Sequence, residues 1–238
     1  MKIDVITFKD RLRDNLLLGN TVIVVDVLRC TTSLITAVMN GSEKIIPTTE
    51  PGDAVALASH IGTGECVIGG ERGGLMLPGF TVGNSPNEYS REMVEGKTVI
   101  VSTSNGTAAI CGAKSAKHVL LGALINCDAV AKLAAAYGDD VLIVCAGTDG
   151  SVSADDLCAA GAIISRIRKH SNNCVISDIA AISEHLYSGM HNGSFDLSKT
   201  YHYSRLMRLG FREDIEYCMQ EDITDCVPIY DDGIITKC

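Results

Sequence analysis

The stretch Thr98-Val-Ile-Val-Ser-Thr-Ser-Asn-Gly-Thr107 begins with an apolar, β-branched run and ends in hydroxyls, an amide and a glycine, without a charged residue. Its first half predicts a β-strand, and Ala108-Ala109-Ile110 after it predict the start of a helix. A loop that leads from a strand into a helix presents backbone N–H groups and hydroxyls to an anion. We therefore expect a phosphate or a similar group to bind here.

Two further stretches share the pattern of a turn glycine, two polar residues and a continuous apolar run. They are Gly19-Asn-Thr-Val-Ile-Val-Val-Asp26 and Gly138-Asp-Asp-Val-Leu-Ile-Val144. The opening stretch shows the same pattern when it is read from its preceding turn glycine, as Gly96-Lys-Thr-Val-Ile-Val101. Such runs are typical of strands covered on both faces, as in a parallel sheet. Weaker strands are expected at 44–46, 65–68, 118–121 and 174–176, and helices at 32–39, 52–59, 128–137 and 153–169. The alternation predicts an α/β fold with a largely parallel sheet.

Two regions depart from this alternation. Residues Gly69–Pro86 are rich in glycine and proline and predict a polar loop, whose length indicates a functional role. From Ser177 onward the chain is mainly helical, with a loop at Gly189–Ser194 and a final extended segment at Val227–Thr236. No linker or charge run forces a boundary, so we expect one domain over residues 1–238, with a division into two lobes near 120–126 as the alternative.

The composition is that of an ordinary folded protein, with 46% hydrophobic and 21% charged residues. The net charge of −9 argues against nucleic acid as a partner, while the apolar fraction allows a homodimer. The ten cysteines form no C-x-x-C pair, which favours reduced and mostly buried thiols. There is no signal-like segment and no apolar run of about 20 residues, so we expect a cytoplasmic protein without a membrane partner.

Four loops carry the residues that could perform chemistry. Ligands of open α/β sheets bind beyond the carboxyl ends of the strands, so these loops are expected to meet there and to form the active site. The loops are Asp26–Ser33, Gly69–Gly74, Ser102–Thr107 and Cys145–Gly150 with the following Asp155-Asp156.

The first loop places a carboxylate and an arginine beside a helix start. Asp26 ends a buried strand and could be a metal ligand, a nucleophile or base, or a structural cap for the next helix. Arg29, followed by Thr31 and Thr32, would bind an anion with a bidentate fork, and an exposed arginine on a helix turn is the alternative.

The second and fourth loops add further charges. Arg72, between paired glycines, would clamp a substrate anion, and Glu71 could orient an arginine or bind metal, unless this is a flexible surface loop. Asp149 supplies an oxygen ligand of the kind that Mg²⁺ prefers. Asp155 and Asp156 could do the same, but acids in a first turn are also ordinary helix starters.

Cations and hydroxyls for anions, together with carboxylates for a hard metal ion, suit phosphate-ester chemistry. Two alternatives remain open at this point. Cys66 and Arg72 have the C-x5-R spacing of metal-free cysteine phosphatases, although Val67 and Ile68 are expected to continue the strand past Cys66. The chain could also be a non-catalytic protein that binds small anions.

The motifs in these loops resemble those of the 2-phosphosulfolactate phosphatase family. They are Val-Asp-Val-Leu-Arg-x-Thr-Thr (25–32), Gly-Glu-Arg-Gly-Gly-Leu (70–75), Pro-Gly-Phe-x-x-Gly-Asn-Ser-Pro (78–86), Thr-x-Asn-Gly-Thr (103–107), Cys-Ala-Gly-Thr (145–148), Ser177-Asp178 and Gly-Phe-x-x-Asp-Ile (210–215). The resemblance implies Mg²⁺-dependent hydrolysis of 2-phospho-3-sulfolactate to 3-sulfolactate and phosphate, a reaction of coenzyme M biosynthesis. It also implies an α/β/α fold with the site among these loops.

On this basis we expect Asp26, Arg29 and Arg72 to be catalytic, and Asp26, Glu71 and Asp149 to hold Mg²⁺. The expected partner is a small anionic phosphate ester. The residues expected to bind it are Thr31, Thr32, Glu71, Gly73, Gly74, Thr103, Ser104, Asn105, Gly106 and Thr107.

Overall fold

The structure, a computed structural model, describes residues 1–62 and 64–238. Its strands are β1 (Lys2–Ile6), β2 (Thr21–Val25), β3 (Lys44–Pro47), β4 (Cys66–Arg72), β5 (Leu75–Met76), β6 (Thr98–Ser102), β7 (His118–Gly122), β8 (Val141–Cys145), β9 (Val175–Ile176), β10 (Pro228–Asp231) and β11 (Ile234–Lys237). Its α-helices are α1 (Asp14–Leu17), α2 (Cys30–Met39), α3 (Pro51–Ile61), α4 (Arg91–Val94), α5 (Gly106–Gly112), α6 (Cys127–Tyr137), α7 (Ala154–His170), α8 (Asp178–Asn192), α9 (Tyr201–Arg208) and α10 (Arg212–Cys218). Short 3₁₀ turns lie at Lys9–Arg11, Pro86–Glu88, Leu124–Asn126 and Leu197–Lys199.

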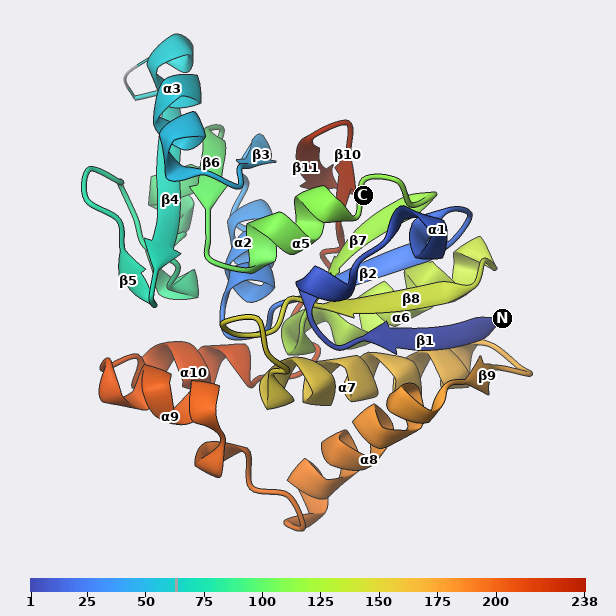
Figure 1. The fold of residues 1–238 in the computed structure, drawn as a ribbon. Coiled ribbons are helices and arrows are strands. Elements are labelled where there is room, and N and C mark those ends of the chain that lie inside the picture. The colour runs from blue at the N-terminus through green and yellow to red at the C-terminus, as the bar shows by residue number, and fades with distance from the viewer. Residues whose placement is uncertain (63) are drawn as a thin grey trace.

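These strands form one mixed, mostly parallel sheet of 11 strands, flanked by helices, so the predicted α/β class is confirmed. The order is β5-β4-β6-β3-β11-β10-β7-β2-β8-β1-β9. In Figure 1, α7 and α8 lie below β8 and β1, whereas α1 and α5 lie above them. The three apolar runs of the sequence become β2, β6 and β8, and all five residues of each are buried. The core therefore sits along these central strands, as their unbroken apolar pattern predicts.

The sheet contains two parallel groups joined by the C-terminal hairpin. One group is β4-β6-β3 and the other is β7-β2-β8-β1-β9. The hairpin β10–β11 is antiparallel to both neighbours and meets each through one residue pair, Ile235 with Ile45 and Ile229 with Leu120. The pairings β3–β11, β11–β10 and β10–β7 are all antiparallel, so the parallel strands of the two groups run in opposite directions. In Figure 1 the carboxyl ends of β4 and β8 approach the same central region, above α9 and α10.

Three sequence expectations needed correction. Gly69–Pro86 is not one loop, because residues 69–72 continue β4 and Leu75–Met76 form β5. Gly70 pairs with Ser102 of β6 so closely that a Cβ would collide with the carbonyl oxygen of Ser102. This glycine therefore serves a close strand approach rather than a turn.

The other two corrections concern the C-terminal part. Helix α8 continues to Asn192, so the loop expected at Gly189–Ser194 begins later. The extended segment at Val227–Thr236 is a hairpin, whose two strands turn at Asp232-Gly233, both with positive φ. An Asp-Gly pair is a strong hairpin signal, which the sequence contains between two β-rich runs.

The surface and the thiols agree with the composition. All ten cysteines are free in the described part of the chain, and most are buried, as predicted. Within residues 1–62 and 64–238 no helix has both the length and the hydrophobicity needed to cross a membrane.

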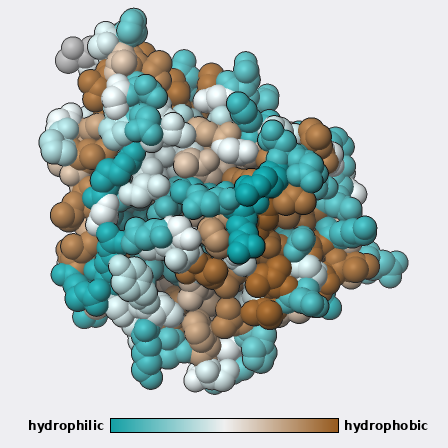
Figure 2. Space-filling view, in the orientation of Figure 1, coloured by the Kyte–Doolittle hydropathy of each residue, from teal (hydrophilic) through white to brown (hydrophobic). Residues whose placement is uncertain are grey.

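Figure 2 shows hydrophobic residues over α3 and beside β5, where Val55, Leu75 and Met76 are exposed. The homodimer and the one-domain organisation, with its alternative division near 120–126, stay predictions.

Candidate active site

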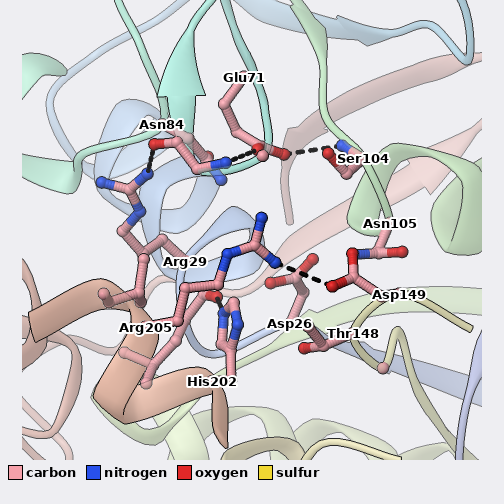
Figure 3. Close-up of a pocket in the computed structure, with 15 residues that line it drawn as sticks. Asp26, Arg29, Glu71, Asn84, Ser104, Asn105, Thr148, Asp149, His202 and Arg205 are labelled. Carbon is pink, nitrogen blue, oxygen red and sulfur yellow. Dashed lines mark hydrogen bonds and ion pairs between the residues drawn. The ribbon is translucent and has the colours of Figure 1, made fainter. Parts of the chain in front are cut away.

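A pocket lies where the four loops meet, and it draws residues from the carboxyl ends of β2, β4, β6 and β8. Figure 3 shows the side chains that line it. The lining residues are Asp26, Leu28, Arg29, Glu71, Gly73, Gly74, Asn84, Ser104, Asn105, Gly147, Thr148, Asp149, His202, Arg205 and Leu206. Helix α9 supplies the last three, so the C-terminal helices close the side of the pocket that the sheet leaves open.

Asp26 follows the last residue of β2 and is almost fully buried. Its Oδ1 atom accepts the backbone N–H of Cys30 at 3.1 Å, so it caps the start of α2. The Oδ2 atom faces the α5 N-terminus, where a Cβ on Gly106 would lie only 2.6 Å away. Asp26 therefore fills the helix-cap role considered for it and also lines the pocket, while its role as metal ligand, nucleophile or base stays a prediction.

The environment of Asp26 disfavours its negative charge. Burial raises the pKa of this carboxyl from 3.8 to about 6, and the nearby charges of Glu71 and Asp155 act in the same direction. The N–H of Cys30 and the nearby His202 act in the opposite direction. A buried acid with acidic neighbours is a common feature of sites that bind a cation or move a proton.

Glu71 links two loops from neighbouring strands of the sheet. Its Oε2 atom accepts the N–H of Gly74 at 2.7 Å, and its Oε1 atom accepts the N–H of Ser104 at 2.8 Å. The carboxylate is buried at the end of β4. Its position is therefore fixed by backbone groups, and the flexible surface loop considered from the sequence is not what the structure shows.

Asp156 fixes two other site loops from the first turn of α7. It is buried and accepts the N–H of Val27 at 2.9 Å and the N–H of Gly147 at 3.0 Å. Burial and the neighbouring charges of Asp155 and Asp26 raise the pKa of Asp156 well above its ordinary value. Asp155 accepts the hydroxyl of Ser153 and is also buried. Both acids are helix-start residues as well as part of the acidic surroundings of Asp26.

Arg29 lines the pocket but is held tightly by other groups. Its guanidinium forms a buried ion pair with Asp214 at 2.5 Å, donates to the carbonyl of Gly74 at 2.8 Å, and lies over the ring of Phe211. Its side chain is only 2% exposed, so the alternative of an exposed arginine on a helix turn is wrong. Asp214 belongs to the Gly-Phe-x-x-Asp-Ile motif, which thereby connects α10 to the first loop.

Arg72 is not among the residues that line the pocket. It donates to the carbonyls of Glu71 and Thr49 and to the hydroxyl of Ser102, with N–O distances of 2.8 to 3.1 Å. Cys66 opens β4, and its thiol lies near the carbonyls of Ala58 and Gly62. Since Cys66 and Arg72 lie at opposite ends of one strand, they do not form the loop that a cysteine phosphatase needs.

The remaining predicted substrate-binding residues divide into two groups. Gly73, Gly74, Ser104 and Asn105 line the pocket, as does Asp149 from the predicted metal set. Thr31 and Thr32 bond to the backbone of Asp26 and Val27, and Thr103 and Thr107 bond to each other, all four being buried. Gly106 approaches Asp26 without lining the pocket. These hydroxyls shape the loops rather than face a ligand.

Three polar pocket residues, together with the apolar Leu206, were not expected from the sequence. Asn84 lies in the Pro-Gly-Phe-x-x-Gly-Asn-Ser-Pro motif, which offered a signal, whereas His202 and Arg205 of α9 offered none. The Nε2 atom of His202 donates to the carbonyl of Leu28 at 2.6 Å, and its buried Nδ1 has no partner among the described residues. Arg205 pairs with Asp149 at 2.9 Å. Only tertiary packing brings α9 to these loops.

The pocket's oxygen atoms fit a hard cation. Asp26 and Glu71 offer carboxylates, and the buried Oδ1 of Asn84 has no hydrogen-bond donor in the described part of the chain. Mg²⁺ is usually bound through one or two carboxylates together with water and substrate phosphate oxygens. Among the described residues, three acid or thiol groups come within 4.8 Å of one another only at Cys127, Glu221 and Asp222, outside the pocket. If a cation binds in the pocket, Asp26, Glu71 and Asn84 are the residues that would hold it.

Comparison with known proteins agrees with the motifs. The family model for 2-phosphosulpholactate phosphatase matches residues 6–233. Proteins named probable 2-phosphosulfolactate phosphatase include one from Clostridium kluyveri, 42% identical over all of this chain and 98% of that protein. Others are from Clostridium tetani, 40% identical over 99% of this chain and the whole relative, and Clostridium botulinum, 38% identical over the full length of both.

Proposed function

This chain belongs to the 2-phosphosulfolactate phosphatase family, and from that premise we propose that its pocket hydrolyses 2-phospho-3-sulfolactate with Mg²⁺ as cofactor. The observation that carries the proposal is Asp26, a buried carboxylate with a raised pKa at the point where the strand-end loops meet. The products are 3-sulfolactate and phosphate, as in coenzyme M biosynthesis. An oxygen–phosphorus bond forms, the ester P–O bond breaks, and the leaving alkoxide gains a proton.

Charge balance supports the need for a cation. The pocket's ionisable side chains are the acids Asp26, Glu71 and Asp149 and the bases Arg29, Arg205 and His202. Arg29 is already paired with Asp214, and Arg205 with Asp149. A substrate with phosphate, carboxylate and sulfonate groups brings several more negative charges. Mg²⁺ bound at Asp26 and Glu71 would neutralise the transferring phosphoryl group and lower the pKa of a bound water. Two carboxylates without it would repel that group.

The chain's own residues then supply position. The loop of Ser104 and Asn105, at the N-terminus of α5, lines the pocket, and we expect the N–H of Asn105 to contact a phosphoryl oxygen. Glu71 fixes this loop through the N–H of Ser104. We propose that Arg29 keeps its positive charge at the pocket wall and that Arg72 acts by holding the end of β4, since its donors bind Glu71, Thr49 and Ser102. The expectation that Asp149 holds Mg²⁺ stays a prediction, and in this structure its carboxylate pairs with Arg205 instead.

The test is release of phosphate from 2-phospho-3-sulfolactate by the purified protein, in Mg²⁺ and in excess EDTA. We expect turnover only with Mg²⁺, and we expect Asp26→Asn to lower kcat by at least about 100-fold while the circular dichroism spectrum is unchanged. Asp53→Asn, an exposed acid on α3, is the matched control. Tight substrate binding without turnover in Mg²⁺ would instead identify a non-catalytic anion-binding protein.

Acid quench of a single turnover separates two routes for the oxygen that attacks phosphorus. A phosphate covalently trapped on Asp26 would assign this carboxylate as the nucleophile. Attack of water on phosphorus puts one solvent oxygen into phosphate on either route, so absence of a trapped intermediate at every quench time would assign water as the direct nucleophile.

A further inference from the structure

Arg205 is the pocket arginine with donors to spare. Its Nη1 atom donates to Asp149, and no other hydrogen bond of this guanidinium occurs among residues 1–62 and 64–238. A Cβ on Gly73 would lie 3.5 Å from the Nη2 atom, so the guanidinium lies over a position that has no side chain. In Figure 3 the guanidinium points into the middle of the pocket, toward Asp149.

The backbone of α9 holds Arg205 in this place. The next residue, Leu206, is buried in the core, and Leu209 lies so close to Gly74 that a Cβ there would come within 2.9 Å of it. The helix is therefore docked directly on the Gly73-Gly74 turn. This packing presents Arg205 to the same pocket as Asp26 and Glu71.

The other two arginines near the pocket are committed to the protein. Arg29 is 2% exposed and already bonds to Asp214 and to the carbonyl of Gly74. Arg72 does not line the pocket and donates to two carbonyls and a hydroxyl. The side chain of Arg205 is 24% exposed. A substrate anion therefore gains more from Arg205 than from either of the arginines that the sequence analysis singled out.

The partner of Arg205 can be exchanged at small cost. Asp149 is 58% exposed, and ion pairs with an exposed member contribute little to stability because water solvates both states. A carboxylate or sulfonate of the substrate offers the same charge and can accept a bidentate pair of N–H bonds from Arg205. Asp149 is left in water, where its charge remains solvated.

We propose that Arg205 determines specificity by binding a second anionic group of the substrate, one that is not hydrolysed, with Asp149 as its competing counter-ion. The inference rests on the proposed function, in which Asp26 and Glu71 bind the phosphoryl end through Mg²⁺. The pocket thus selects small phosphate esters that carry a carboxylate or sulfonate over esters that carry none. Asp149 weakens this selection because it competes for the same donors.

The test compares 2-phospho-3-sulfolactate with p-nitrophenyl phosphate, which lacks a second anion. For Arg205→Gln we expect KM for the first substrate to rise about tenfold or more, the value of one charge-assisted contact, while KM for p-nitrophenyl phosphate stays within about twofold. Asp149→Asn should lower KM for 2-phospho-3-sulfolactate. Arg208→Gln, at an exposed arginine of the same helix, is the control and should change neither constant.

Equilibrium binding of 3-sulfolactate, measured by calorimetry, tests the inference without turnover. Arg205→Gln should weaken binding, and Asp149→Asn should strengthen it. An equal rise of KM for both substrates, or unchanged 3-sulfolactate binding in Arg205→Gln, would overturn the role given to Arg205. Absence of turnover in the wild type with Mg²⁺ would overturn the proposed function alone, because the binding experiment would still decide the role of Arg205.

Discussion

Oδ1 of Asp156, in the first turn of α7, lies 2.9 Å from the backbone nitrogen of Val27, in the loop that follows β2. Its other oxygen accepts the N–H of Gly147, in the loop that follows β8. A single buried carboxyl group thus joins the loop that contains Asp26 to the loop that contains Asp149.

Asp156→Ala leaves two buried N–H groups without an acceptor, so we expect the free energy of unfolding to fall by about 2–4 kcal/mol. Asp156→Asn keeps one amide oxygen as an acceptor and should cost less than Asp156→Ala. Urea denaturation followed by circular dichroism measures both. Equal stability of wild type and Asp156→Ala would show that the two loops do not depend on this carboxyl group.

Asp26 makes the stability of the metal-free protein depend on pH. Its pKa is raised from 3.8 to about 6 in the folded protein, so the folded state binds the proton more tightly than the unfolded state does. The contribution of Asp26 is therefore favourable at low pH and is lost as the pH rises through about 6, by up to about 3 kcal/mol.

The measurement is urea denaturation in EDTA at several values between pH 4 and pH 8. Asp26→Asn should be less sensitive to pH over this window than the wild type. Added Mg²⁺ should stabilise the wild type more at pH 8 than at pH 5, because metal ligands must be deprotonated. Identical pH profiles for wild type and Asp26→Asn would contradict the raised pKa.

Glu71 should control the Mg²⁺ requirement. In Glu71→Gln the neutral amide cannot supply the negative charge, and its NH₂ group faces a backbone N–H of Gly74 or Ser104. We expect the Mg²⁺ concentration for half-maximal activity to rise at least about tenfold. Glu43→Gln, at an exposed position, is the matched control. An unchanged Mg²⁺ requirement in Glu71→Gln would remove Glu71 from the metal site.

Arg72 should matter for activity although it does not line the pocket. Arg72→Ala removes the donors that hold the carbonyls of Glu71 and Thr49, so the end of β4 loses its position. We expect kcat/KM to fall at least about tenfold, while the far-UV circular dichroism spectrum stays that of the wild type. Arg91→Ala serves for comparison, since Arg91 is exposed and pairs only with Glu95 in the described residues. Wild-type turnover in Arg72→Ala would remove this residue from the mechanism.

Cys66 should be dispensable. It is the first residue of the seven-residue strand β4, so it lies at the end of the strand away from the pocket. Its thiol lies near α3. Cys66→Ser should therefore retain the kcat and KM of the wild type in Mg²⁺, and EDTA should abolish activity in both. Loss of activity in Cys66→Ser, with full wild-type activity in EDTA, would revive a cysteine-phosphatase mechanism.

Much of the fold was readable from local patterns. The apolar runs that became β2, β6 and β8 are buried on both faces, and such runs have few alternatives to a covered parallel strand. The four loops that follow strands were recognised by their residue types, and they do line one pocket. Two of the expected loops were wrong because of glycines. Glycine is typical of loops, but Gly70 lies in β4 and Gly189 in α8, where each is tightly packed.

The sequence by itself determined the buried strands β2, β6 and β8, the loops at their ends and the presence of Asp26, Arg29 and Glu71 among the pocket residues. Tertiary structure alone decided which pocket arginine keeps unused donors among the described residues. Arg29 and Arg72 look available in the chain, but packing commits them to Asp214 and to backbone carbonyls, while α9 brings in Arg205 from a part of the sequence without a motif. The physical reason is that the residue type determines which groups a side chain can bind. Its burial and its neighbours in the fold determine how many of its donors and acceptors remain available to a ligand.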